Sequence, residues 1–208
     1  MTRRFLVSLL PLALALTAGV ATQAKAGIIL DGGFENPTPG NYTSSLGDGW
    51  NVNGTIRVDN ATSPVGVPHS GNQSVYLDYG YSPNTVSQML TTIVNQTYLV
   101  SFWIADSGPN LVTVDFGSQT LFNGTAPTNG VSLASDYVNY AYTVTATSTT
   151  TNLSFIGQYL NSNQGNGTNL DDVTVDAAPE PATLAFTGLG CLALVTLRPL
   201  LKTPAPRG

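Results

Sequence analysis

Residues 97–105 read Thr-Tyr-Leu-Val-Ser-Phe-Trp-Ile-Ala, and this stretch decides the fold class. Successive side chains of a β-strand point to opposite faces, so a strand here carries two sets of side chains. One set is large and apolar: Tyr98, Val100, Phe102 and Ile104. The other set is also rather apolar, so we expect this strand in the middle of a sheet.

The same alternation recurs along the chain, with clusters of Gly, Asn, Pro and Ser between the alternating segments. Short strands separated by turn signals are typical of an all-β sandwich or barrel, and no segment indicates an amphipathic helix. Long loops at 59–72 and 159–167 favour a jelly roll. The other expected strands are 27–30, 51–58, 74–79, 85–93, 111–116, 137–147, 151–156 and 168–175.

The first 26 residues have the pattern of a secretory signal peptide. Arg3 and Arg4 precede an apolar run at 5–20, and the segment ends in Ala24-Lys25-Ala26. A basic start, a short apolar core and a small-residue exit indicate cleavage after Ala26 and export by the Sec pathway. A membrane anchor is the alternative, and Pro11 argues against it.

The C-terminal residues 177–208 form a second processing segment. Pro179-Glu180-Pro181 precedes an apolar stretch at 184–197, which is shorter than the roughly 20 residues that cross a bilayer comfortably. Three cations follow this stretch: Arg198, Lys202 and Arg207. Positive charge stays cytoplasmic, so everything before Pro179 would lie outside the inner membrane.

This arrangement resembles the PEP-CTERM sorting signal of Gram-negative bacteria. The resemblance covers the Pro-Glu-Pro at 179–181, the apolar helix and the basic tail. It implies recognition by an exosortase, transient inner-membrane anchoring, removal of the tail, and delivery to the cell surface or the exopolysaccharide matrix. An ordinary single-span anchor is the alternative. The only cysteine, Cys191, lies in the tail, so the rest of the chain has no disulfide.

The residues between the two processing segments are strongly acidic. Residues 27–178 contain eleven carboxylates and one cation, Arg57, so eleven minus one leaves a formal charge of −10. Nucleic-acid binding needs clustered Lys and Arg, and it is therefore excluded. An acidic surface rich in Asn, Ser and Thr suits divalent cations and neutral partners with many hydroxyl groups.

The order of short motifs along residues 27–176 resembles the galactose-binding-like jelly rolls of many carbohydrate-binding modules. The resemblance runs from Gly33 to Val175, and it implies one β-sandwich domain without fixing a ligand. The motifs are Gly32-Gly33-Phe34-Glu35, Gly49-Trp50, the segment 69–75, the segment 96–103 and Leu170-Asp171-Asp172-Val173.

The last motif predicts a buried carboxylate. Asp171, Val173 and Val175 share one face of a strand, so Asp171 points inward if the valines do. A buried carboxylate needs a cation or several hydrogen-bond donors, and calcium takes such oxygen ligands. The resemblance implies a structural calcium held by Glu35 and Asp171, with Asp172 in reserve. The alternative is that Asp171 caps a neighbouring loop through backbone amides.

Sugar binding needs an exposed aromatic ring beside short polar side chains. The candidates are Trp50, Tyr79, Tyr81 and Tyr159, and packing in the core is the alternative for Trp50 and for Trp103.

Catalysis has few candidate groups, because His69 is the only histidine and no Gly-x-Ser-x-Gly motif occurs. We therefore expect no catalytic residues, and an exported, non-enzymatic surface or matrix protein with weak carbohydrate binding. A dedicated lectin-like protein and a small glycan hydrolase acting through paired acids are the alternatives.

Overall fold

The computed structural model describes residues 28–37, 42–62, 66–77, 83–106, 108, 110–125, 133–159 and 167–178. These residues form ten strands and one short 3₁₀ turn, η1 (Ala134–Asp136). The strands are β1 (Tyr42–Gly47), β2 (Trp50–Asn60), β3 (Gln73–Tyr76), β4 (Asn84–Thr91), β5 (Thr97–Asp106), β6 (Asn110–Phe116), β7 (Gln119–Thr125), β8 (Val138–Thr145), β9 (Thr150–Tyr159) and β10 (Thr168–Ala177).

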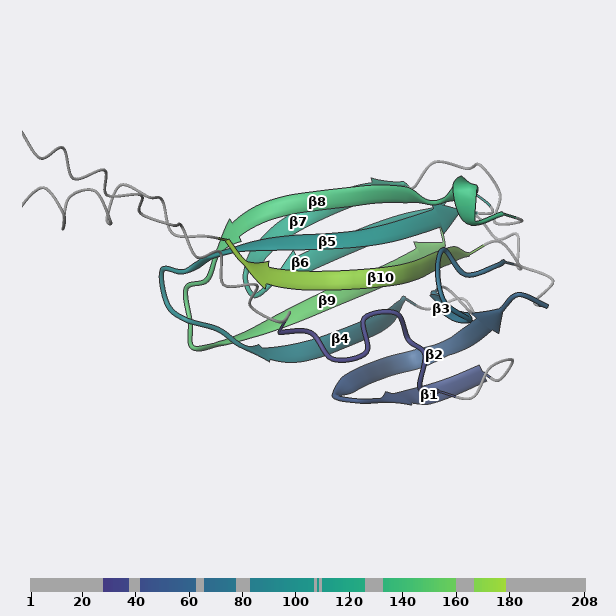
Figure 1. Cartoon of the computed structure of the whole chain (residues 1–208), viewed down its shortest axis with the longest axis horizontal. Coiled ribbons are helices and arrows are strands. Elements are labelled where there is room, and N and C mark those ends of the chain that lie inside the picture. Colours follow the sequence, from purple (N-terminus) through teal and green to yellow (C-terminus); the bar gives the residue numbers. More distant parts are fainter. Residues whose placement is uncertain are drawn as a thin grey trace, which may run out of the picture.

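All strand pairs are antiparallel, in the order β7-β6-β9-β4-β2-β3-β10-β5-β8, with β1 added to β2. The order folds over into two layers, one with β10, β5 and β8 and the other with β4, β9, β6 and β7 (Figure 1). The two ends of this strand order, β7 and β8, also come together, because the ring centroids of Phe122 in β7 and Tyr140 in β8 lie 4.7 Å apart. The result is a barrel-like jelly roll.

The strand β2 belongs to both layers. Its first half pairs with β4, as in Asn53 opposite Thr85, and its second half pairs with β3. The change of partner follows Gly54, which has a φ of +99°. A Cβ at Gly54 would lie 1.9 Å from Oδ1 of Asn84, and that oxygen accepts the Thr55 N–H at 3.0 Å. Only glycine suits this bend.

The core lies between the two layers and is built from the inward faces of their strands. The alternation expected for residues 97–105 is confirmed, because Tyr98, Val100, Phe102 and Ile104 are all at most 1% exposed. Phe102 packs edge-on against Phe155 of the opposite layer, with ring centroids 5.3 Å apart. Contacts of this kind hold the layers together by burying apolar surface.

The expected strands agree with the structure except in three segments. Residues 42–47 and 119–125 are strands that the sequence pattern did not predict, and the pairing of each contains a register shift that breaks simple alternation. Residues 28–30 form no strand, although the Ile28 N–H donates to the Val175 carbonyl. The last strand reaches Ala177, one residue into the segment assigned to sorting.

The predicted signal peptide and the predicted C-terminal helix lie outside the described residues. Within the part of the chain that is described, no helix is long and apolar enough to cross a membrane.

The bend in β2 predicts unequal effects of two alanine substitutions. Gly47 also has positive φ (+77°), but a Cβ there would meet nothing within 4 Å. Gly47→Ala should therefore cost about 1–2 kcal/mol of unfolding free energy from the backbone alone. Gly54→Ala should cost more, because Asn84 must also lose its bond to Thr55. Urea denaturation measures both, and equal losses would contradict this account of the bend.

Candidate functional site

The two layers present outer faces of different character. We call the outer side of β3, β10, β5 and β8 the loop-covered face, because residues 66–72 of the β2–β3 connection lie over it. We call the outer side of β4, β9, β6, β7 and the first half of β2 the neutral face.

A β-bulge in β10 decides which side chains reach the loop-covered face. Asp171 lies opposite Trp103, whereas Val175 lies opposite Val100, so four steps along β10 match three along β5. The additional residue is Asp172, with a φ of +47°. The expectation that Asp171 shares a face with the valines is therefore wrong. Val173 and Val175 enter the core, while Asp171 lies on the outer side with Trp103.

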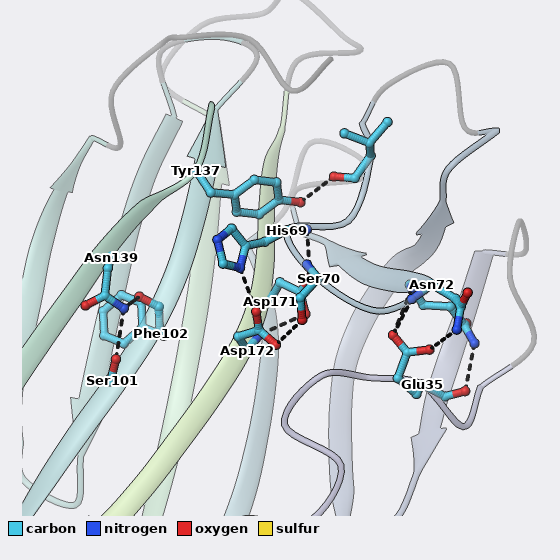
Figure 2. A network of polar contacts seen from close by, with 12 residues as sticks. Glu35, His69, Ser70, Asn72, Ser101, Phe102, Tyr137, Asn139, Asp171 and Asp172 are labelled. Atoms are coloured by element: carbon cyan, nitrogen blue, oxygen red, sulfur yellow. Dashed lines mark hydrogen bonds and ion pairs between the residues drawn. The ribbon is translucent and has the colours of Figure 1, made fainter. Parts of the chain in front are cut away.

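Asp171 is nevertheless fully buried, because residues 66–72 cover it. Its Oδ2 accepts the N–H groups of His69 (2.9 Å) and Ser70 (3.2 Å), and its Oδ1 accepts the N–H of Asp172 (2.7 Å). Figure 2 shows these bonds beneath the loop. Asp171 thus caps the loop, which is the alternative to metal binding that the sequence left open.

The side chains of the loop are held as well. Asp172 contacts His69 Nδ1 through Oδ2 at 2.6 Å and accepts the Ser70 hydroxyl through Oδ1 at 2.8 Å. The His69 ring stacks on Trp103 with centroids 3.8 Å apart and planes 17° apart. The hydroxyl of Tyr137 donates to the Val67 carbonyl at 2.9 Å. His69, the only histidine of the chain, is therefore held by Asp172 and Trp103 as part of the fold.

Glu35 holds the far end of the same loop. Its Oε1 accepts the N–H groups of Asn72 (2.7 Å) and Gln73 (3.1 Å), and its carbonyl accepts the Gln73 amide at 2.8 Å (Figure 2). Gly71 makes this approach possible, because a Cβ there would lie 2.1 Å from Glu35 Oε1. The structure thus brings Glu35, Asp171 and Asp172 to one loop.

These carboxylates suit a hard cation chemically, although each already accepts hydrogen bonds. Burial and, to a smaller extent, the charge of Asp172 raise the pKa of the Asp171 carboxyl to about 7. Arg57, the only Lys or Arg of residues 27–178, is paired with Asp59. The described residues contain no group of three or more His, Cys, Asp or Glu that could hold a metal ion. A calcium site would therefore need backbone carbonyls as further ligands, and calcium stays a prediction.

The structure contradicts one of the predicted aromatic contacts. Trp50 is 5% exposed, packs 5.0 Å from the Phe34 ring, and donates its indole N–H to the Asp31 carbonyl. It belongs to the core and offers no platform to a sugar. Trp103 has one ring face covered by His69.

The remaining predicted site residues fall where the structure gives no side-chain description. Tyr79, Tyr81 and the sorting motif Pro179, Glu180 and Pro181 lie outside the described residues, and so does the side chain of Tyr159.

The neutral face carries two rows of short polar side chains across five strands. The strand register defines the rows, because residues directly opposite each other share a face. The first row is Asn53, Thr85, Ile156, Thr113 and Asn123. The second row is Asn51, Ser87, Ser154, Asp115 and Thr120. With strands about 4.8 Å apart, each row spans about 19 Å.

The side chains in the middle of the face are less exposed than those at its two edges. The outermost side chains, Asn51, Asn53, Thr120 and Asn123, are exposed, whereas those in the middle strands are half-buried and Ser154 is only 7% exposed. Asp115 is the only charged group in the two rows, and its Oδ1 accepts the Thr120 hydroxyl at 2.7 Å. The sequence contained a signal for this face, since Asn, Ser and Thr occupy the positions that alternate with core residues.

A third polar group lies inside one end of the sandwich. Asp106 is fully buried, and its Oδ1 accepts the Asn110 amide (3.0 Å) and the Thr168 hydroxyl (2.6 Å). Its Oδ2 has no hydrogen-bond partner among the described residues. Burial raises the pKa of the Asp106 carboxyl from 3.8 to about 6, against the opposing effect of hydrogen bonds from the Thr168 hydroxyl and from the side chain and backbone of Asn110.

Comparison with solved structures supports the jelly-roll assignment. The structure of TmCBM61 in complex with β-1,4-galactotriose has a TM-score of 0.54 and 16% identity, covering 74% of this chain and 100% of that one. The chain has the fold of carbohydrate-binding modules. At this identity the likeness establishes the fold alone.

Two further modules are similar at lower scores. The CBM22-1 xylan-binding domain of Paenibacillus barcinonensis Xyn10C has a TM-score of 0.47 and 19% identity, covering 76% of this chain and 99% of that one. The CBM6cm-2 module of Cellvibrio mixtus lichenase 5A, in complex with cellotriose, has a TM-score of 0.42 and 11% identity, covering 74% and 98%. No protein family model and no curated protein matches the chain.

The Asp106 carboxyl predicts a pH dependence of stability. Its pKa rises on folding, so its stabilising contribution is complete below about pH 4 and is lost as the pH rises through about 6. Asp106→Asn keeps the acceptor oxygen and removes the charge. We expect it to be more stable than the wild type at pH 8 by roughly 1–3 kcal/mol, with the difference vanishing near pH 4.

Denaturant titrations at the two pH values measure this difference. Asn123→Ser, an exchange of uncharged side chains at an exposed position, should differ from the wild type by the same amount at both pH values. An Asp106→Asn protein that is less stable than the wild type at pH 8 would contradict the prediction.

Proposed function

We propose that this chain is an exported, non-enzymatic protein of the cell surface or exopolysaccharide matrix that binds carbohydrate weakly on its neutral face. The observation that carries the proposal is the pair of polar rows with a single carboxylate, on a domain with a formal charge of −10. The fold shared with carbohydrate-binding modules supports the same function.

The chemistry of the face fits a polysaccharide. Hydroxyl and amide side chains both donate and accept hydrogen bonds, as sugar hydroxyls do. Ile156 lies at the centre of the first row and offers an apolar contact to the C–H side of a sugar ring. Without an aromatic ring in either row, the contact area is modest, which supports weak rather than tight binding.

Two observations support the absence of catalysis. His69 is engaged by Asp172 and by stacking on Trp103, and both Asp171 and Asp172 are occupied with the loop. On the neutral face Asp115 stands alone in its row, so no second carboxylate faces it there across a bound glycan. This favours the non-enzymatic reading over the glycan hydrolase.

Binding on the neutral face predicts that a charge in the rows abolishes retention on polysaccharides. Ser87→Glu adds a second carboxylate in the middle strands of the face, and it should lower affinity for any retained polysaccharide at least tenfold. Thr143→Glu adds the same charge to the exposed outer side of β8 and should have no effect.

A glycan array finds the ligand, and affinity electrophoresis on that polysaccharide then compares the variants. Retention that survives Ser87→Glu but is lost with Thr143→Glu would move the site to the other face. Absence of retention on every glycan would leave a purely structural role, and release of reducing ends would make the protein an enzyme.

The proposed export and sorting rest on the terminal sequence motifs. A Sec signal ending at Ala26 and a Pro-Glu-Pro at 179–181 before an apolar stretch support processing at both ends. Mass spectrometry of the mature protein should find a start at Gly27 and an end near Pro179. An intact C-terminus reaching Gly208 would replace exosortase processing with a permanent anchor.

We also propose a structural calcium at the loop, with Glu35 and Asp171 as its carboxylate ligands and Asp172 in reserve. Carboxylate oxygens are ligands that calcium takes, and the carboxylates of Glu35, Asp171 and Asp172 all contact residues 69–73. Calcium that binds only the folded state must raise the melting temperature relative to chelator, and Asp171→Asn should remove this rise. Equal melting temperatures of the wild type in both conditions would exclude the ion.

A further inference from the structure

The turns at one end of the sandwich contain no charged residue. Three turns meet there: 92–96 between β4 and β5, 117–118 between β6 and β7, and 146–149 between β8 and β9 (Figure 1). All of these residues are described, and none is Asp, Glu, Lys or Arg.

The first of these turns exposes two aliphatic side chains. Ile93 is 56% exposed and Val94 is 44% exposed. The turn is well fixed, because the Gln96 N–H donates to the Ile93 carbonyl at 3.0 Å and the Asn95 N–H donates to the Ala146 carbonyl at 2.8 Å. Apolar groups on a fixed, uncharged turn are suited to an apolar surface.

The chain leaves the domain at this same end. The Ala178 N–H donates to the Thr97 carbonyl at 2.9 Å, and the Gln96 side-chain amide donates to the Ala178 carbonyl at 3.1 Å. The apolar part of the tail starts at Ala182, only four residues later. Four extended residues span at most about 14 Å, so a bilayer that holds the tail lies close to the Ile93–Val94 turn.

One carboxylate, Asp176 in β10, lies beside this end, and the sequence places a second, Glu180, between Ala178 and the apolar stretch. The turns themselves add no negative charge that anionic lipid headgroups would repel.

We propose that the end formed by these turns rests on the lipid bilayer while the tail is inserted, with Ile93 and Val94 at the level of the headgroups. The proposal depends on the tail insertion described under the proposed function. It fixes the orientation of the domain, because the loops at the opposite end then point away from the membrane.

The test uses the full chain reconstituted in two sets of phosphatidylethanolamine–phosphatidylglycerol vesicles: one contains a headgroup-level quencher lipid for labels on the domain, and the other contains an acyl-chain quencher lipid for a label at Cys191. Cys191 is the only native cysteine and lies in the apolar stretch, so a fluorophore there reports insertion of the tail. Val94→Cys in a Cys191→Ser background reports the turn. Ser135→Cys in the same background, on the exposed η1 turn at the opposite end, is the matched control (Figure 1).

We expect at least twofold quenching at position 94 and none at position 135. No quenching at 94, with a quenched label at Cys191, would overturn the proposed contact and leave tail insertion intact. An unquenched label at Cys191 would instead overturn the insertion on which the proposal depends. A label at position 94 that becomes buried when the protein concentration is raised, and not when lipid is added, would identify a second copy of the chain as the partner. That result would overturn the contact with lipid.

Discussion

The buried carboxylate of Asp171 accepts two backbone N–H groups of the β2–β3 loop, and these hydrogen bonds hold the loop on the sheet. A loop without its own secondary structure leaves backbone donors that must find partners when they are buried. Asp171 and Glu35 supply acceptors to four such donors, at His69, Ser70, Asn72 and Gln73. The described part of the loop, residues 66–72, is therefore fastened at two points, by Asp171 and by Glu35.

This fastening gives the two outer faces different roles. One face holds the loop, the His69–Trp103 stack and the buried carboxylate of Asp171, so its side chains are occupied with each other. The opposite face keeps its hydroxyl and amide side chains in rows without such partners on a packed loop. A hydroxyl-rich ligand is thus expected on the face that contributes least to holding the fold together.

Much of the fold was predictable from the sequence, because strand alternation reports burial directly. The pattern in 97–105 gave the central strand and its core face, and the Gly-Phe-Glu and Leu-Asp-Asp-Val motifs indicated that Glu35 and Asp171 act in the same region. The bulge at Asp172 was not predictable from alternation, since an inserted residue reverses every later assignment of faces. Trp50 could not be assigned either, because an aromatic residue after a glycine turn fits both a core and a surface site. The neutral face needed the strand register, which brings together residues from five separate segments.

Amide hydrogen exchange at His69 and Ser70 tests whether the Asp171 carboxylate holds the loop on the sheet. Both residues lie outside regular secondary structure, so their N–H groups would exchange rapidly if the loop were loosely held. The account predicts protection comparable to that of neighbouring strand amides such as Val75, because Asp171 accepts both N–H groups in a buried site. Rapid exchange at these two positions, in a protein whose strands are protected, would contradict it.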